Sequence, residues 1–299
     1  MKKASIILRI LLGSLFLFSG IVKLYPIEPF ELLFVDIGIT SWSFSPVFAR
    51  IIIGIEIFIG LLFIFQFRPK VTALTALAVL LFFTAYLIYI IITEGNDSNC
   101  GCLGQLLPMT PLQSIGKNAV LLIACSLLLW KGKAISFQWK PLLVAIPLIT
   151  AFSLPFILNP MNLTDYSASS NEMVLDLKRL PEIKVENTVV NLKEGEKIVA
   201  FLALFCEHCK YAAQKLSVLN KKPQAPEIYL ILYGEEEKLS DFLNETKANF
   251  PYVLFNNPDF FTLTGGVFPS IFYLKDGQPI KRWTGKTFTY GEIENLKKI

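Results

Sequence analysis

The chain has 299 residues, of which 53% are hydrophobic and 17% are charged, and its formal net charge is +4. A soluble protein of two domains carries more charge than this, so the composition predicts a protein that lies partly in a membrane. The lysines and arginines form no cluster interleaved with aromatic residues, so we expect no nucleic-acid partner.

Five apolar segments are predicted to cross the lipid bilayer. The first, Ala4 to Leu24, is too long for a signal-peptide core and has no cleavage site after it, so we expect it to be retained. The other four segments are Val47 to Phe67, Val71 to Thr93, Ile115 to Trp130 and Pro141 to Leu158. Residues 1–158 are therefore expected to form an all-α membrane bundle of about five helices.

The basic residues between these segments predict the orientation of the chain. With the N-terminus in the cytoplasm, the inner segments hold seven of them, namely Lys2, Lys3, Arg68, Lys70, Lys131, Lys133 and Lys140. The outer loops, Tyr25 to Pro46 and Glu94 to Gln113, contain no lysine or arginine. By the positive-inside rule, the second outer loop and the C-terminal domain lie on the periplasmic side of a bacterial inner membrane.

Four of the five cysteines form two closely spaced pairs, Cys100/Cys102 and Cys206/Cys209, which suits redox exchange in an oxidising compartment. Gly101 allows a tight turn between Cys100 and Cys102, and the small ring of a CxC disulfide is strained and easily reduced. Two free thiols or a structural bridge are the alternatives for this pair. Cys125, deep in the fourth predicted span, is expected to be a small apolar residue of the bundle.

Several ionisable residues lie inside the predicted spans, where charge is costly and usually functional. Lys23, Arg50 and Lys117 lie near the outer ends, where they would stabilise a thiolate or a quinone oxygen. For Lys23 and Lys117 the alternative is a side chain that extends to the membrane interface. Glu56 lies near the middle of the second span and must be neutral, paired or exposed to a wet cavity, which suits a proton relay. Arg9 would be its partner or an interface anchor.

Residues 159–182 are polar and are predicted to be a tether between the membrane part and a C-terminal domain, residues 183–299. That domain contains Cys206-Glu207-His208-Cys209 between the apolar run Ile198 to Leu204 and a helical pattern. The free N–H groups and positive dipole end of a helix N-terminus favour a thiolate at Cys206. Cys209, one turn on, would close the disulfide, and an imidazolium at His208 would stabilise the thiolate further.

The pattern after this motif predicts a strand at Glu227 to Leu232, a helix at Glu235 to Lys247 and a strand at Tyr252 to Phe255. A hairpin around Asp276-Gly277 and a last helix from Tyr290 follow, and Pro269 precedes the hairpin. This order resembles an α/β thioredoxin-like domain, in which Pro269 stands where a cis-proline faces the CxxC. No tryptophan precedes Cys206, and Ala200 stands where thioredoxin has a buried Asp.

The membrane part resembles the DoxX/MauE family. The residues that carry the resemblance are Arg9 to Gly13, Ser19 to Leu24, Glu56 and Cys100-Gly101-Cys102-Leu103-Gly104. The resemblance implies an architecture similar to the four-helix core of vitamin K epoxide reductase relatives, which pass electrons between a thioredoxin-like partner and a quinone. It also implies a role in disulfide formation or maturation of exported proteins, first recognised in methylamine utilisation. Those epoxide reductase relatives have a CxxC in the fourth span, where this chain has only Cys125.

We therefore predict a membrane-bound thiol–disulfide oxidoreductase that acts on the thiols or disulfides of exported proteins. Cys206 would be the attacking or attacked sulfur and Cys209 the resolving one, with Cys100 and Cys102 as the membrane-side exchange pair. An alternative enzyme has the reverse electron flow and is a reductase that supplies electrons to substrates on the outer face. The alternative is a non-redox assembly factor in which the CxC and CxxC pairs hold a soft metal ion. No metal site is assigned, and a quinone is the one cofactor that the resemblance implies.

Overall fold

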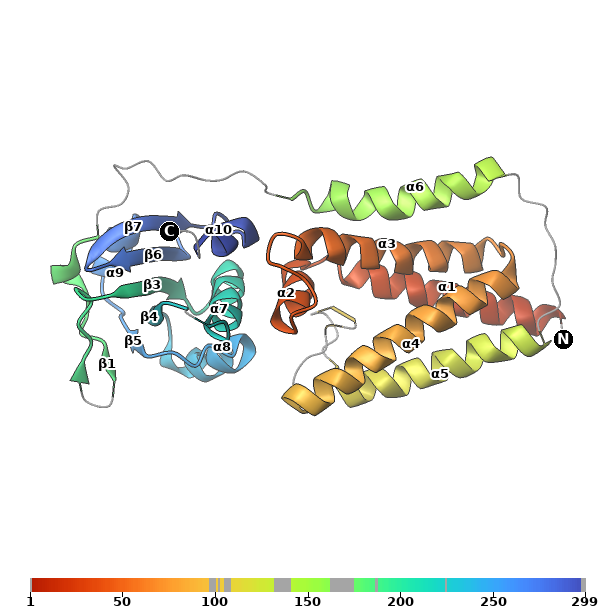
Figure 1. The fold of residues 1–299 in the computed structure, drawn as a ribbon, viewed down its shortest axis with the longest axis horizontal. Helices are drawn as coiled ribbons and strands as arrows, with labels where there is room; N and C mark the ends of the chain where they lie inside the picture. Colours follow the sequence, from red (N-terminus) through yellow and green to blue (C-terminus); the bar gives the residue numbers. More distant parts are fainter. Residues whose placement is uncertain are drawn as a thin grey trace. The chain divides into compact units, whose positions relative to one another are not determined.

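The computed structural model describes residues 2–96, 101, 103–104, 109–131, 141–161, 175–185, 188–223 and 225–296. The chain divides into two compact units (Figure 1). The first comprises Met1–Phe34 and Phe44–Met161, and the second comprises Val35–Ser43 and Asn162–Ile299. We call them the membrane unit and the thioredoxin-like unit.

The membrane unit is helical. Its helices are α1 (Lys2–Val22), α2 (Glu28–Asp36), α3 (Ser45–Ile64), α4 (Pro69–Glu94), α5 (Pro111–Lys131) and α6 (Pro141–Leu158). Helices α1, α3, α4 and α5 are long and apolar enough to cross a membrane, which confirms four of the five predicted spans. The apolar part of α6, Val144–Leu158, is shorter, so the fifth span stays a prediction. Helix α2 lies in a segment that the sequence analysis treats only as an outer loop.

Small residues allow the helices of the membrane unit to approach closely. A Cβ atom on Gly13 of α1 would lie 2.8 Å from the carbonyl oxygen of Gly60 of α3, and a Cβ on Gly60 would lie 2.9 Å from that of Gly13. Such contacts are typical of helices packed in lipid, where no hydrophobic effect drives them together. Helix α3 also packs against α6, and α4 packs against α5 (Figure 1). Cys125 is fully buried in the apolar cluster between these helices, as predicted.

The thioredoxin-like unit is built on a five-stranded sheet. In chain order its main elements are β3 (Glu196–Ala203), α7 (Glu207–Asn220), β4 (Glu227–Tyr233), α8 (Leu239–Thr246), β5 (Tyr252–Leu254), α9 (Asp259–Thr264), β6 (Ser270–Lys275), β7 (Gln278–Thr284) and α10 (Tyr290–Asn295). The strand order is β5-β4-β3-β6-β7, with β3, β4 and β5 parallel and β6 and β7 antiparallel to their neighbours. Strand β3 is central and is buried from Lys197 to Ala203.

The elements predicted after the CxxC motif are confirmed to within a few residues. The hairpin turns at Asp276 and Gly277, which both have positive φ. Helix α9 was not predicted, although it covers one face of the sheet by packing Phe260 and Leu263 against Phe201 and Phe272. A small hairpin of β1 (Lys184–Val185) and β2 (Thr188–Val189) was also not predicted.

Both described ends of the predicted tether contact their own units. Asn159 donates a hydrogen bond from its side chain to the carbonyl oxygen of Leu24 in the membrane unit. Leu175 is buried in the core of the thioredoxin-like unit, where the short helix η2 (Leu177–Arg179) also packs its Leu177. The boundaries 159 and 182 stay predictions, and residues 162–174 lie outside the described part of the chain.

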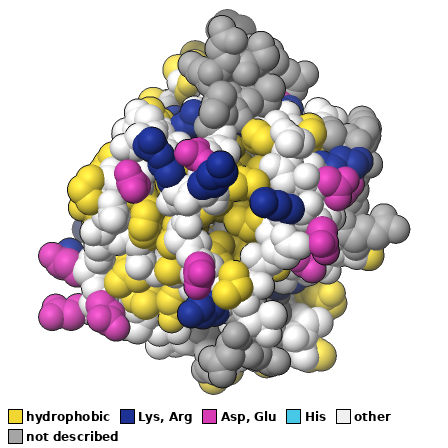
Figure 2. Space-filling model, turned by 90° about the vertical axis from the view of Figure 1, so that its left-hand side faces the viewer, with side chains coloured by type: hydrophobic (Ala, Val, Ile, Leu, Met, Phe, Trp, Pro, Cys, Tyr) yellow, Lys and Arg dark blue, Asp and Glu magenta, His cyan; other side chains and the backbone are white. Residues whose placement is uncertain are grey.

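Figure 2 shows one face of the molecule, on which acidic and basic side chains are interspersed with hydrophobic ones. Among the described residues of that face, no large area carries a single sign of charge.

Candidate active site

The CxxC motif lies where the central strand passes into helix α7. The hydrogen bonding between β3 and β4 continues one residue beyond β3, because the N–H of Leu204 donates to the carbonyl oxygen of Tyr233 at 2.9 Å. Cys206 is the N-cap residue of α7 and has extended backbone angles. Its carbonyl oxygen accepts the first helical hydrogen bonds, from Cys209 at 3.0 Å and Lys210 at 3.1 Å. The fold therefore places Cys206 at the N-terminus of the helix, as predicted.

The surroundings of Cys206 favour its thiolate. Its Sγ accepts a hydrogen bond from the backbone N–H of Cys209 at 3.4 Å. The pKa of Cys206 is lowered to about 6, chiefly by a hydrogen bond with the Cys209 side chain and then by the backbone N–H groups of Cys209 and His208. Partial burial and the charge of Glu207 act in the opposite direction. At pH 7 a thiol of this pKa is about 90% ionised, against about 3% for an ordinary cysteine.

Cys209 differs from Cys206 both in its burial and in the direction of its pKa shift. Its side chain is fully buried, and its Sγ accepts a hydrogen bond from the N–H of Ala203 at 3.3 Å. Burial, and next the hydrogen bond with Cys206, raise the pKa of Cys209 well above its usual range. Because the thiolate is the nucleophile of disulfide exchange, Cys206 is placed to attack or be attacked first, and Cys209 to resolve the product.

His208 is exposed, and its ring packs edge-on against Tyr211 with the centroids 6.4 Å apart. It favours the Cys206 thiolate through its backbone N–H. A contribution from its imidazolium stays a prediction.

Glu207 and Lys210 are functional candidates that were not predicted from the sequence. Lys210 Nζ lies 3.1 Å from a carboxylate oxygen of Glu207 and 2.8 Å from one of Glu245. The spacing of Glu207 and Lys210 is that of neighbours on one helix face and was available as a signal. Glu245 comes from α8, so only the tertiary structure brings it to this cluster.

The peptide bond between Phe268 and Pro269 is cis, as the resemblance to thioredoxin implies. The rings of Phe205 and Phe268 meet edge to face, with centroids 6.0 Å apart, so the residue before Pro269 lies beside the residue before Cys206. Phe205 is 57% exposed and Val267 is 46% exposed. An apolar surface of this kind next to a reactive thiol suits contact with another polypeptide.

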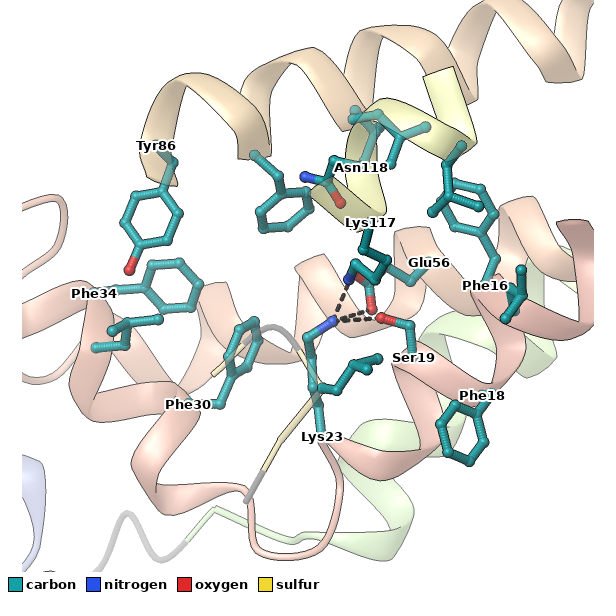
Figure 3. A pocket seen from close by; sticks show the side chains of 17 residues that line it. Phe16, Phe18, Ser19, Lys23, Phe30, Phe34, Glu56, Tyr86, Lys117 and Asn118 are labelled. Carbon is teal, nitrogen blue, oxygen red and sulfur yellow. Dashed lines mark hydrogen bonds and ion pairs between the residues drawn. The ribbon is translucent and has the colours of Figure 1, made fainter. Parts of the chain in front are cut away.

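A second group of candidates surrounds a cavity of about 130 Å³ in the membrane unit (Figure 3). Its polar lining residues are Ser19, Lys23, Glu56, Tyr86, Lys117 and Asn118. The ammonium of Lys23 lies 2.6 and 2.7 Å from the two carboxylate oxygens of Glu56 and 2.8 Å from the Ser19 hydroxyl. Glu56 is thus paired, and Lys23, only 2% exposed, does not extend to the interface.

Arg50 is not among the residues that line this cavity. Its guanidinium lies 2.5 Å from the carboxylate of Glu31 and donates to the carbonyl oxygens of Pro46 at 2.7 Å and Asn159 at 2.8 Å. These contacts tie α2 and the chain after α6 to the start of α3, which is a structural role. Glu31 was not predicted as a site residue, because nothing local in the sequence distinguishes it from a solvated loop residue.

Cys100 and Cys102 lie outside the described residues. Leu103, which follows Cys102 in the sequence, lines the cavity. Gly104 donates a hydrogen bond to the carbonyl oxygen of Gly101 at 3.1 Å. A Cβ on Gly104 would lie 2.5 Å from the carbonyl oxygen of Val22, so only glycine fits there. Within the described part of the chain, no group of three or more His, Cys, Asp and Glu side chains is placed to hold a metal ion.

Comparison with known proteins finds similarity to the N-terminal region and to the whole chain. Residues 1–131 match the family described as methylamine utilisation protein MauE. The N-terminal region is a MauE family region. Protein TlpB of Flavobacterium psychrophilum is 29% identical over 335 aligned residues, which cover 94% of this chain and 91% of that protein. TlpB is thus a homologue of both units together.

Several solved structures of other proteins are similar to part of this chain. They include a secreted Mycobacterium tuberculosis disulfide oxidoreductase homologous to E. coli DsbE, with 11% identity, coverage of 44% of this chain and 100% of that one, and a TM-score of 0.35. StoA from Bacillus subtilis has 17% identity, coverage of 39% and 93%, and a TM-score of 0.33. The sheet order, the CxxC at the start of α7 and cis-Pro269 make the C-terminal unit thioredoxin-like. The chain thus joins a region that matches the MauE family to a domain with a thioredoxin-like fold and a CxxC pair.

Proposed function

We propose that this protein is a membrane-anchored thiol–disulfide oxidoreductase. Its Cys206/Cys209 pair would exchange electrons with exported proteins and with the Cys100/Cys102 pair, in support of disulfide formation or maturation of those proteins. The observation that carries the proposal is the asymmetry of the two sulfurs. Cys206 is accessible with a pKa of about 6, whereas Cys209 is fully buried.

The exchange proceeds in two displacements. In the reducing direction, the Cys206 thiolate attacks one sulfur of a partner disulfide, an S–S bond forms between them, and the partner's second sulfur leaves as a thiolate. Cys209 then loses its proton and attacks Cys206 Sγ, which releases the partner dithiol and leaves the pair oxidised. Two electrons pass to the partner. The same steps run in reverse when the pair acts as an oxidant.

The proposal requires both cysteine pairs on one side of the membrane. We propose that α6 is the fifth span, with the N-terminus in the cytoplasm, because the basic residues of the loops then lie inside. A reporter that is active only outside the cytoplasm should be active when fused after Ile299 and when inserted near Asn96. A reporter after Ile299 that is active only in the cytoplasm would contradict this topology.

A trapping experiment tests direct exchange between the pairs. The Cys209→Ser variant lacks the resolving thiol, so Cys206 should accumulate in a disulfide with Cys100 or Cys102. Peptide mapping should show a reductant-sensitive link within one chain. The link should be absent from the Cys206→Ala variant and retained in a Cys125→Ala control. If Cys209→Ser traps only other proteins, the two pairs do not exchange directly.

A further inference from the structure

An exposed apolar surface lies beside Cys206 in the thioredoxin-like unit. Phe205 is 57% exposed, Val267 is 46% exposed and Phe261 is 39% exposed. The ring of Phe268 lies between the other two rings, with its centroid 6.0 Å from that of Phe205 and 6.4 Å from that of Phe261. We call these four residues the apolar patch. Because Phe205 directly precedes Cys206, a molecule that covers the patch also meets the reactive thiol.

The core of the unit holds the patch in place. Phe260 is fully buried, and its ring centroid lies 5.7 Å from that of Phe261 and 6.4 Å from that of Phe268. The exposed rings are thus already fixed by packing before a partner arrives, which lowers the entropy that binding costs. A group of exposed apolar side chains next to a reactive group is typical of a contact site for another molecule.

Acidic residues border the patch where the chain leaves strand β4. Because β3 and β4 are parallel, the segment after β4 lies at the same edge of the sheet as Cys206. The two segments are close, since a Cβ atom on Gly234 would lie 3.0 Å from Cβ of Leu204. Tyr233 contacts the patch, with its ring centroid 4.9 Å from that of Phe261. The residues directly after Gly234 are all exposed and acidic, namely Glu235, Glu236 and Glu237.

The charge around this edge of the sheet is negative. The acidic side chains are Glu207, Glu235, Glu236, Glu237, Asp241, Glu245 and Asp259, and the basic ones are Lys210, Lys238, Arg282 and Lys286. Two of these lysines are already held by acids of the same group, Lys210 by Glu207 and Glu245, and Lys238 by Glu235. The Cys206 thiolate adds a further negative charge at neutral pH. A partner that carries positive charge near its own cysteine is therefore attracted to this surface.

We propose that the partner at this surface is a polypeptide segment whose cysteine stands between a large apolar residue and a basic residue. This inference rests on the proposed thiol–disulfide function and names its substrate class. The apolar residue covers the patch beside Phe205 and Phe268. The basic residue lies against the acids that follow β4. The two contacts together place the partner's sulfur at Cys206, and they select basic polypeptides over acidic ones.

Rates of exchange with four synthetic peptide disulfides test the proposal. Each is a symmetrical dimer of one peptide, joined through its single cysteine, and the flanking residues are Phe and Lys, Phe and Glu, Ser and Lys, or Ser and Glu. The Cys206 thiolate attacks one sulfur and forms an S–S bond with the first peptide, and the second peptide leaves as a thiolate. Cys209 then attacks Cys206 Sγ and releases the first peptide, so two electrons pass to the dimer. The reduced full chain is used in phosphatidylcholine nanodiscs, and the rate of the Cys206→Ala variant is subtracted.

The peptide with Phe and Lys should react fastest. At low salt the peptides with Lys should react about fivefold faster than those with Glu, and this ratio should approach one in about 1 M salt, where charges are screened within roughly 3 Å. The peptides with Phe should react about fivefold faster than those with Ser at either salt concentration, because partial burial of a phenyl ring does not depend on screening.

Two variants test the residues that select the partner, each with a matched control. Glu235→Gln/Glu236→Gln/Glu237→Gln should lower the Lys-to-Glu ratio to about twofold or less. Glu182→Gln/Glu194→Gln/Glu196→Gln removes three exposed acids that precede or begin β3, away from the patch, and should keep the ratio. Phe205→Ser/Val267→Ser should lower the Phe-to-Ser ratio to about twofold or less. Val189→Ser/Ile280→Ser changes two exposed apolar residues outside the patch and should keep that ratio.

Failure of this inference is distinguishable from failure of the proposed function. Exchange with all four peptides at equal rates overturns the inference alone, whereas exchange with none of them overturns the proposed function. A Phe preference that persists in Phe205→Ser/Val267→Ser would mean that lipid or a second copy of the chain covers the patch, and it overturns the inference. A Lys preference that persists in the triple variant of Glu235, Glu236 and Glu237 overturns it as well. Each ratio compares two peptides on one protein sample, so partial unfolding of a variant does not change it.

Discussion

The thiol site, formed by Cys206 and Cys209, and the cavity of the membrane unit both hold a charged or ionisable group in apolar surroundings, but they are built differently. The thiol site comes from a contiguous stretch, in which a buried strand ends at Ala203 and backbone N–H groups of the next helix lower the pKa of Cys206. The cavity takes its polar residues from four helices, with Ser19 on α1, Glu56 on α3, Tyr86 on α4 and Lys117 on α5. A contiguous site should therefore tolerate distant changes, whereas the cavity should depend on the packing of the whole bundle.

The largest expected effect is the difference between the two sulfurs of the thiol site. At pH 7 the reduced protein should be alkylated at Cys206 about 30-fold faster than an ordinary thiol, from the ionised fractions alone. Cys209 should react far more slowly than Cys206, because it is buried and its pKa is raised. Cys206→Ala should abolish exchange, and Cys209→Ala should stop turnover after one mixed disulfide. Mass spectrometry after timed alkylation measures both rates.

The pH dependence of alkylation tests the lowered pKa of Cys206 directly. The rate at Cys206 should rise with pH through a midpoint near 6 and then level off. Since this folded pKa lies below the unfolded value of about 8.5, ionisation of Cys206 stabilises the reduced form fully above pH 8.5. That stability is lost as the pH falls through 6. A midpoint near 8.5 would contradict the activated thiolate.

The buried ion pair between Arg50 and Glu31 tests whether the thiol site depends on the packing of the membrane unit. Arg50→Met removes the guanidinium that pairs with the buried Glu31 carboxylate, so we expect a loss of about 3–5 kcal/mol in the free energy of unfolding. Arg50→Met/Glu31→Met should lose much less, because both charges are removed. Denaturant unfolding in detergent measures both. The thiol site should be unaffected, with the Cys206 midpoint unchanged in the double variant. A shift of that midpoint by a unit would show that the two regions are coupled.

A smaller effect is expected from Glu207 and Lys210, which tune the thiolate. Glu207→Gln removes a negative charge that opposes the Cys206 anion, so the pKa of Cys206 should fall by less than one unit, the scale expected of an exposed charge in water. Lys210→Met leaves Glu207 without its paired cation and should raise that pKa. Glu237→Gln, an exposed acid of the short helix η3 (Glu236–Lys238), is the matched control and should have no effect. Equal midpoints in Glu207→Gln and the wild type would rule out this tuning.

The smallest expected effect is that of the His208 side chain. His208→Gln keeps the backbone N–H that favours the thiolate, and the imidazole ring packs against Tyr211. We expect the pKa of Cys206 to rise by a few tenths of a unit at most. A rise of a full unit, measured by the same alkylation profile, would show that the imidazolium stabilises the thiolate strongly.

The sequence by itself determined the features that depend on local pattern. Four membrane helices follow from apolar length, the strands and helices after the CxxC follow from periodicity, and the place of Cys206 follows from a strand that runs directly into a helix. The glycine position was equally informative, since Asp276-Gly277 forms the predicted turn. In each case the deciding interactions lie within a few residues of one another.

Only the tertiary structure decided how residues far apart in the chain share their environments. Lys23 and Glu56 are 33 residues apart and form one ion pair, whereas the sequence left each with several alternatives. Arg50 resembled them in the sequence but is held by Glu31 and backbone carbonyl groups. The burial of Cys209 depends on the sheet beneath α7. Burial and ion pairing depend on which helices and strands pack together. The free energy of an ionised side chain or thiolate is therefore set more by its neighbours in three dimensions than by its neighbours in the sequence.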